Sequence, residues 1–118
     1  MFARTPRLLL RPGWSDDAAA LATALNDENI ARNLGRVPHP YTLEDAQAFL
    51  SSPGDVRHPR LLAFLRTHGA PRLIGGCGLT PSADGRAELG YWVARPYWGL
   101  GFATEAGAAL LRAARTFG

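Results

Sequence analysis

The segment "ARPYWGLGFATEAGAALL", residues 94–111, decides the fold. It places an aromatic pair and two closely spaced glycines, Gly99 and Gly101, directly before an Ala- and Leu-rich run of helical composition. A helix N-terminus has unsatisfied N–H groups and a partial positive charge, so a bare loop that leads into it can bind phosphate groups. The same glycines also suit a simple tight turn between a strand and a helix. From "GLG" alone, both interpretations stay open.

A dinucleotide-binding fold is the rival interpretation of this segment. That fold requires a third Gly or Ala at a set spacing, whereas "GLGFAT" has Thr104 there. The apolar runs that precede the segment are "RLLAFLRT", "RLIGGCGLT" and "AELGYWV", and turn signals separate them. The second turn contains Asp84-Gly85, which is the strongest short hairpin signal. We therefore predict three antiparallel strands before the last helix, which argues against a parallel dinucleotide fold.

The first half of the chain predicts a strand followed by helices. "RLLLRP", residues 7–12, has the pattern of a short strand, and Ser15 is placed to cap a helix over "AAALATAL". "NDENIARNL" predicts a short helical turn before a loop rich in Gly and Pro. "YTLEDAQAFL" predicts a helix capped by Thr42, with Asp45 completing a weaker form of the capping box. The expected class is α+β.

The last helix has an apolar face at a spacing of four, three and four residues. Ala106, Leu110, Ala113 and Phe117 fall on that face, while Glu105 points elsewhere.

Composition limits the protein to one domain, residues 1–118, because 118 residues with 47% hydrophobic content suffice for one compact core. The thirteen basic residues are all Arg and are scattered from Arg4 to Arg115, which argues against a nucleic-acid binder despite the net charge of +3. Cys77 is the only cysteine, which excludes an internal disulfide and fits a reducing compartment as a small buried apolar residue. No apolar run approaches membrane-spanning length, so we expect a cytoplasmic protein without a membrane partner.

These segments resemble the GNAT acetyltransferases, in the branch of RimJ/RimL-like ribosomal-protein N-terminal acetyltransferases. The resemblance covers nearly all of the chain: it begins at "TPRLLLRP", continues through "HPYTLEDAQAFL" and is most specific in "AELGYWVARPYWGLGFATEA". The acetyl-CoA motif of that superfamily has Gln or Arg, two residues, Gly, one residue, then Gly or Ala. This register falls on Trp98, Gly101 and Ala103. Trp98 departs from Gln or Arg, although "PYWG" is a form that the branch commonly uses.

The resemblance implies acetyl-CoA as cosubstrate and no metal. It implies that main-chain amides bind the pyrophosphate and that the pantetheine arm pairs with the edge of the preceding strand, where a main-chain N–H stabilises the oxyanion. Gly90 leaves space over the sheet. The residues implied for the pyrophosphate are Trp98, Gly99, Leu100, Gly101, Phe102, Ala103 and Thr104, and those implied for the pantetheine arm are Tyr91, Trp92 and Val93.

Glu88 is the candidate general base, because it lies in an otherwise apolar strand on the face shared with Gly90 and Trp92, where desolvation favours a base that works near neutral pH. The alternative is a solvated carboxylate or an ion-pair partner of an Arg. In the acceptor-side loop of the family, the candidate substrate-binding residues are Asn33, His39 and Tyr41.

The resemblance implies a GNAT fold, with a mixed, mostly antiparallel sheet flanked by helices. It implies an N-acetyltransferase acting on a primary amine, either of a small molecule or at a protein N-terminus. Family members continue past the last helix into further strands and a helix that often supplies the acid for the CoA thiolate. We therefore expect that the C-terminal part is missing, or that a homo-oligomer or another completing chain flanks residues 91–93. The competing interpretation is a non-catalytic, truncated module that binds CoA or serves in assembly.

Overall fold

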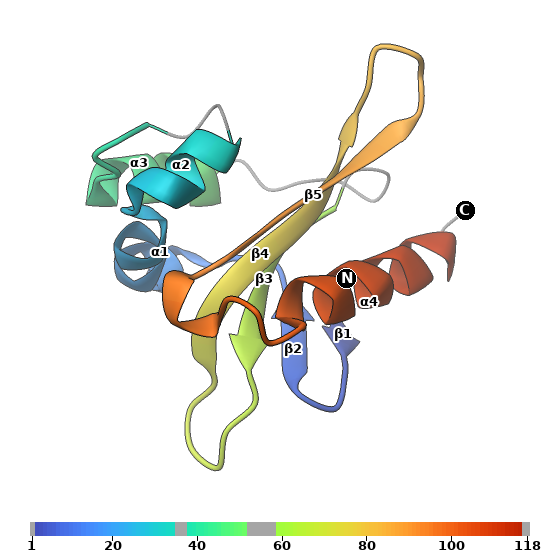
Figure 1. Ribbon diagram of the computed structural model, residues 1–118, viewed down its shortest axis with the longest axis horizontal. Helices are drawn as coiled ribbons and strands as arrows, with labels where there is room; N and C mark the ends of the chain where they lie inside the picture. Colours follow the sequence, from blue (N-terminus) through green and yellow to red (C-terminus); the bar gives the residue numbers. More distant parts are fainter. Residues whose placement is uncertain (1, 35–37, 52–58, 117–118) are drawn as a thin grey trace.

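The computed structural model describes residues 2–34, 38–51 and 59–116 (Figure 1). Within these residues one five-stranded sheet runs in the order β1-β2-β3-β4-β5, and every neighbouring pair is antiparallel. The strands are β1 Ala3–Arg4, β2 Leu8–Arg11, β3 Arg60–Leu65, β4 Arg72–Pro81 and β5 Ala87–Val93. The helices are η1 Ser15–Asp17, α1 Ala18–Leu25, α2 Glu28–Leu34, α3 Leu43–Leu50, η2 Arg95–Tyr97 and α4 Phe102–Thr116. The expected α+β class is confirmed, and the described sheet is antiparallel throughout.

The helices cover opposite faces of the sheet. In Figure 1, α1, α2 and α3 lie together on one side, and α4 lies on the other. Two buried clusters correspond to this division. The cluster under α4 contains Leu8, Leu10, Leu61, Ala63, Ile74, Cys77, Leu79, Phe102, Ala106, Ala109 and Leu110. The cluster under α1–α3 contains Ala18, Leu21, Leu25, Ile30, Tyr41, Ala46, Leu62 and Phe64. Because both faces are covered, the central strands are apolar on both sides instead of alternating with polar residues.

A bulge in β4 lies opposite the end of β5. Ala63 of β3 pairs with Gly75, but the next residue, Phe64, pairs with Leu73, so Ile74 is one extra residue in β4. The carbonyl of Ile74 accepts the N–H of Ala94, the residue that follows β5, at 2.7 Å. Bulges bend a strand and often adjoin functional sites. Here the bulge lies where the chain leaves the sheet for the glycine loop.

The predicted hairpins and one helix cap are confirmed. Gly85 closes the turn between β4 and β5 with φ 83°, a conformation that favours glycine. The N–H of Asp45 donates to Thr42 Oγ1 at 3.1 Å, and the N–H of Thr42 donates back to Asp45 Oδ2 at 2.9 Å. This reciprocal pair is the capping box expected at the start of α3.

The prediction that Ser15 caps the first helix is wrong. Ser15 is instead the first residue of η1, and the N–H of Trp14 donates to Asp17 Oδ2 at 2.7 Å. Asp17 is held in place because Arg11 donates to both of its carboxylate oxygens, at 2.8 and 3.0 Å. The ion pair between Arg11 of β2 and Asp17 therefore decides how the turn begins. A local sequence pattern does not reveal this pair. The short strand β1 was also not predicted.

The apolar face of α4 is confirmed at Ala106 and Leu110, which are buried, whereas Ala113 is half-buried and Phe117 lies outside the described residues. Glu105, expected to point away from the core, contacts β1–β2 instead, as described below. Cys77 is buried, and this burial raises the pKa of its thiol to about 12. Within the described ranges, no helix combines the length and the apolar character needed to cross a bilayer.

Candidate functional site

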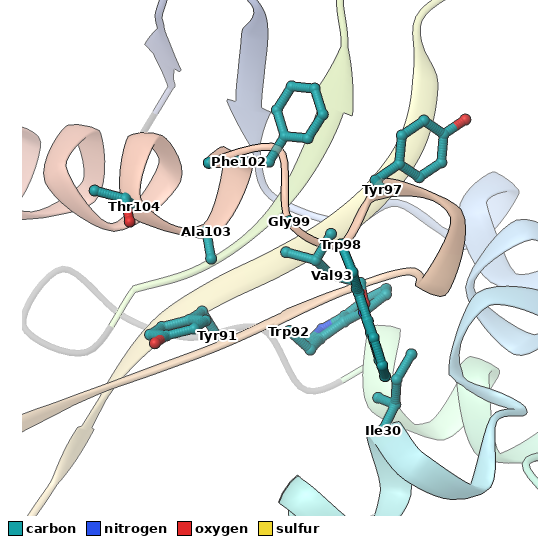
Figure 2. Close-up of a pocket in the computed structure, with 11 residues that line it drawn as sticks. Ile30, Tyr91, Trp92, Val93, Tyr97, Trp98, Gly99, Phe102, Ala103 and Thr104 are labelled. Carbon is teal, nitrogen blue, oxygen red and sulfur yellow. The ribbon is translucent and has the colours of Figure 1, made fainter.

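A cleft of about 520 Å³ opens between the end of β5, the η2 turn and the first turn of α4 (Figure 2). It is lined by Ile30, Tyr91, Trp92, Val93, Tyr97, Trp98, Gly99, Gly101, Phe102, Ala103 and Thr104. The structure thus brings together the strand and loop residues predicted for acetyl-CoA, with the exception of Leu100. Ile30 and Tyr97 were missed. The "PYWG" motif contained the signal for Tyr97, whereas Ile30 reaches the cleft from α2, which no local pattern shows.

The loop into α4 depends on two glycines with left-handed backbone. Gly99 has φ 76° and Gly101 has φ 81°, and L-amino acids with side chains rarely adopt such values. After these two turns, α4 begins at Phe102, which lines the cleft. The glycines therefore have the turn-forming role that the sequence left open. Their turn also leaves the main chain of the loop bare where it faces the cleft.

The first N–H groups of α4 lack a partner within the helix. The first bond of the ladder runs from the N–H of Glu105 to the carbonyl of Gly101, at 3.1 Å. The N–H groups of Phe102, Ala103 and Thr104 precede it and, among the residues that the structure describes, have no hydrogen-bond partner, as is usual at a helix N-terminus. All three residues line the cleft. This end of the helix is thus a candidate anion site, with partial positive charge and donors on one wall of the cleft.

Two members of the predicted loop set have other roles. The N–H of Trp98 donates to the carbonyl of Arg95 at 3.1 Å within the η2 turn. Leu100 does not line the cleft, and its carbonyl accepts from Arg7 at 2.9 Å. Trp98 instead presents its ring, which points toward Ile30 in Figure 2. The free main-chain donors therefore begin after Trp98.

The outer edge of β5 forms the other wall of the cleft. Because the N–H of Ala94 bonds to β4, alternation along an antiparallel ladder turns the N–H and C=O groups of Leu89, Tyr91 and Val93 away from β4. The indole N–H of Trp98 donates to the Val93 carbonyl at 2.5 Å, which joins the loop to this edge. In the part of the chain that the structure describes, no strand pairs with β5 on this side. Tyr91 and the Val93 N–H remain open for pairing.

Glu88 lies near the far end of β5, opposite Thr80 of β4, and is exposed. It shares its face of β5 with Trp92, which packs against the α1–α3 cluster, as the alternation of side chains predicted. The described residues do not give Glu88 the burial that its selection as a base assumed. It is also not among the residues that line the cleft.

The three acceptor-side candidates lie in different environments. His39 is exposed, and Asn33 belongs to α2, with its side chain outside the described residues. Tyr41 is buried, and burial together with the nearby Asp45 carboxylate raises the pKa of its phenol. Tyr41 lines a second, apolar cavity of about 260 Å³ together with Gly90 and Trp92.

This second cavity adjoins the cleft, because Tyr91 and Trp92 line both. A Cβ atom placed on Gly90 would meet no heavy atom within 4 Å, so Gly90 leaves open space over this part of β5 as expected. The two hollows thus approach the same short stretch of strand. A donor in one and an acceptor in the other could meet at Tyr91 and Trp92.

Residues 7–118 match the family model described as "Acetyltransferase (GNAT) domain". The chain belongs to this family. The match includes α2, β5, η2, the glycine loop and α4, which are the elements that build the cleft. No curated protein sequence matches the chain.

Solved structures share the fold. An acetyltransferase of the GNAT family from Bacillus anthracis is 23% identical with a TM-score of 0.77, over 95% of this chain and 64% of that one. A protein from Vibrio cholerae, provisionally named a ribosomal-protein-serine acetyltransferase, is 22% identical with a TM-score of 0.76, over 94% and 64%. An acetyltransferase from Agrobacterium tumefaciens is 26% identical with a TM-score of 0.72, over 95% and 65%. The chain therefore spans about two thirds of the length of these proteins.

Proposed function

We propose that the protein is an N-acetyltransferase that transfers the acetyl group of acetyl-CoA to a primary amine. The observation that carries this proposal is the set of free N–H groups at Phe102, Ala103 and Thr104, behind two left-handed glycines, on a cleft that continues along the open edge of β5. Family membership supports the same activity. One structural neighbour, the microcin C7 self-immunity acetyltransferase MccE, was solved in complex with acetyl-CoA and AMP.

The cleft fits the two chemically different halves of acetyl-CoA. The pyrophosphate is an anion that suits the free donors and the positive end of α4. The pantetheine arm carries two amides, which match the outward N–H and C=O groups of Tyr91 and the outward N–H of Val93. Residues of both groups of donors line the same cleft, so we propose that one extended ligand contacts both.

Catalysis in this site is a matter of alignment and oxyanion stabilisation. A neutral amine attacks the thioester carbonyl, the C–S bond breaks, and the CoA thiolate leaves while the amine loses a proton. A main-chain N–H of the β5 edge at the carbonyl oxygen would contribute about 3 kcal/mol to the transition state. Holding the amine against the thioester supplies a further large share of the rate. We propose Glu88 as the proton acceptor: it does not line the cleft, but it lies opposite Thr80 and on the face of β5 that carries Gly90 and Trp92, all three of which line the second cavity.

For the acceptor we propose the N-terminal amine of a protein, bound from the side of Asn33, His39 and Tyr41. The RimJ/RimL-like segments support this choice, as does the name of the Vibrio cholerae neighbour. A small-molecule amine is the alternative acceptor. The single buried cysteine and the absence of a spanning helix among the described residues are compatible with a cytoplasmic enzyme.

A non-catalytic CoA-binding module is the second candidate function. It is favoured by one observation: none of the described residues that line the cleft is Asp, Glu or His. Such a module would bind the donor, or serve in assembly through the open edge of β5, without transfer.

Calorimetry with acetyl-CoA, followed by a thiol-release assay over peptide N-termini and small amines, tests the proposal. Binding with turnover on peptides is the expected result. Turnover on small amines alone would favour a small-molecule amine as the acceptor in place of a protein N-terminus. Binding without turnover would favour the non-catalytic module. Absence of binding would reject both functions.

A further inference from the structure

The N-terminal strand pair and the glycine loop are joined by one arginine. Arg7, between β1 and β2, donates from its guanidinium to the carbonyl of Leu100 at 2.9 Å and to Glu105 Oε1 at 2.7 Å. The main-chain N–H of Arg7 also donates to Glu105 Oε2, at 3.2 Å. These contacts join segments that are more than ninety residues apart in the chain. From them we infer that Arg7 is a positioning residue, which fixes the loop and the first turn of α4 in the geometry that binds pyrophosphate; this inference rests on the proposed use of acetyl-CoA.

Further contacts fix the side chains of Glu105 and Arg7. The hydroxyl of Thr5 donates to Glu105 Oε2, and the N–H of Leu8 donates to Thr5 Oγ1 at 2.8 Å. The guanidinium of Arg7 also lies over the ring of Phe102, 4.2 Å from its centroid. Phe102 is buried, so the guanidinium is stacked against the core at the first residue of α4. These contacts thus surround the start of α4, with hydrogen bonds at Leu100 and Glu105 and ring stacking at Phe102 between them.

Each contact of Arg7 acts on a different part of the loop. Leu100 lies between the two left-handed glycines, and the bond to its carbonyl turns that carbonyl away from the cleft. Glu105 follows the free donors directly, and its bond fixes the rotation of the first helical turn. On this inference, Phe102, Ala103 and Thr104 keep their place on the cleft because Arg7, which does not line it, holds both the loop and the first turn of α4.

The pair also settles a conflict of charge. Glu105 is an acidic residue in the first turn of α4, at the end of the helix where a pyrophosphate would bind. Its side chain is only 19% exposed; burial alone would raise the pKa of Glu105, but the hydrogen bonds from Thr5 and Arg7 hold it below its usual value. An ionised Glu105 without Arg7 would repel a second anion. Arg7 cancels this charge and leaves the helix end attractive to phosphate.

The fork of the guanidinium is required, because one group makes both contacts. Lys keeps the positive charge but presents a single ammonium, which cannot reproduce a planar pair of bonds to a carboxylate and a carbonyl. The variants Arg7→Lys and Arg7→Ala therefore separate positioning from charge alone. Arg86→Ala is the matched control, since it removes one arginine whose side chain is 87% exposed in the β4–β5 turn.

The experiment compares two donors for each variant. Calorimetry measures the Kd of acetyl-CoA, and an NMR shift titration measures the Kd of S-acetylpantetheine, which has the same thioester and arm but no pyrophosphate. Arg7→Ala should weaken acetyl-CoA binding on the order of tenfold or more, the effect of one charge-assisted hydrogen bond, and leave S-acetylpantetheine binding unchanged. Arg7→Lys should also weaken acetyl-CoA binding, and Arg86→Ala should not.

Three results would overturn the inference. The first is equal acetyl-CoA affinity of Arg7→Ala and the wild type. The second is full recovery in Arg7→Lys, which would reduce the role of Arg7 to its charge. The third is an equal loss for both donors, which would show general damage to the fold. Failure of the wild type itself to bind acetyl-CoA would instead reject the proposed function on which the inference rests.

Discussion

At the scale of single residues, backbone conformation at Gly101 shapes the candidate pyrophosphate site. With φ 81°, any side chain at this position strains the loop by roughly 1–2 kcal/mol. Gly101→Val should therefore raise the Kd of acetyl-CoA at least about tenfold, because the strained loop shifts and the new Cβ lies 3.5 Å from Nη2 of Arg7, whose guanidinium holds the loop. Calorimetry measures the effect.

Gly85→Val is the control for this variant, because Gly85 has nearly the same backbone, φ 83°, in a turn where a Cβ meets nothing within 4 Å. Both variants should lose stability, but only Gly101→Val should lose affinity. Equal acetyl-CoA affinity in both variants would show that the loop is not part of the binding site.

Glu88 provides the second prediction at this scale. If Glu88 accepts the proton of the amine, Glu88→Gln lowers kcat by about 10²-fold or more and leaves the Kd of acetyl-CoA unchanged, because Glu88 does not line the cleft. The control is Glu28→Gln, whose carboxylate is 70% exposed on α2. Steady-state kinetics over a range of pH measures both. Unchanged kcat throughout would assign Glu88 a solvated, non-catalytic role.

At the scale of elements, an ion pair joins the segment before α2 to the η2 turn. Arg95 donates to both carboxylate oxygens of Asp27, at 2.8 and 2.9 Å, and its guanidinium lies 5.3 Å from the centre of the Trp98 ring. The hydrogen bonds from Arg95, above all, lower the pKa of Asp27 from 3.8 to about 2. Because the side chain of Arg95 is 54% exposed, the pair should be weakened by salt, although Asp27 is only 18% exposed.

The pH dependence of this pair has a definite sign. The folded pKa of Asp27 is depressed, so its contribution to stability is present above about pH 4 and is lost as the pH falls through about 2. Asp27→Asn should therefore be less stable than the wild type at pH 7, and the difference should shrink as the pH falls from 4 to 2. Urea unfolding at several pH values measures it. A difference at pH 2 as large as that at pH 7 would contradict this account.

At the scale of the whole molecule, the loop that we propose for acetyl-CoA binding is held by residues from both ends of the sheet. The loop is held by Arg7 from β1–β2, by Trp98 on β5 and by Phe102 in the core. A ligand that binds only this assembled form stabilises it by mass action. At a free concentration of 100 times Kd, acetyl-CoA should add about 2.7 kcal/mol to the free energy of unfolding.

Thermal unfolding with and without acetyl-CoA measures this effect. The midpoint should rise by several degrees for the wild type and by much less for Gly101→Val at the same ligand concentration. A rise of equal size in both proteins would place the ligand elsewhere on the molecule.

The sequence by itself determined the features that depend on neighbours in the chain. The Asp84-Gly85 turn, the Thr42–Asp45 cap and the two glycines before α4 were predictable, because each is a local backbone requirement that only a few residue types meet. The strand and loop residues of the cleft were implied by the resemblance of residues 91–104 to the GNAT family. Their roles in binding and catalysis remain predictions.

Only the tertiary structure decided which distant residues support that segment. Arg7 meets Leu100, Asp27 meets Arg95 and Arg11 replaces Ser15 in shaping the first turn, because sheet order and helix packing bring these residues together. Ile30 likewise reaches the cleft through the packing of α2. Charged pairs of this kind leave no periodic pattern, and any of thirteen arginines could have met any of ten acids. The fold decides which of these residues pair, because two distant residues come into contact only after the chain between them has closed into a loop.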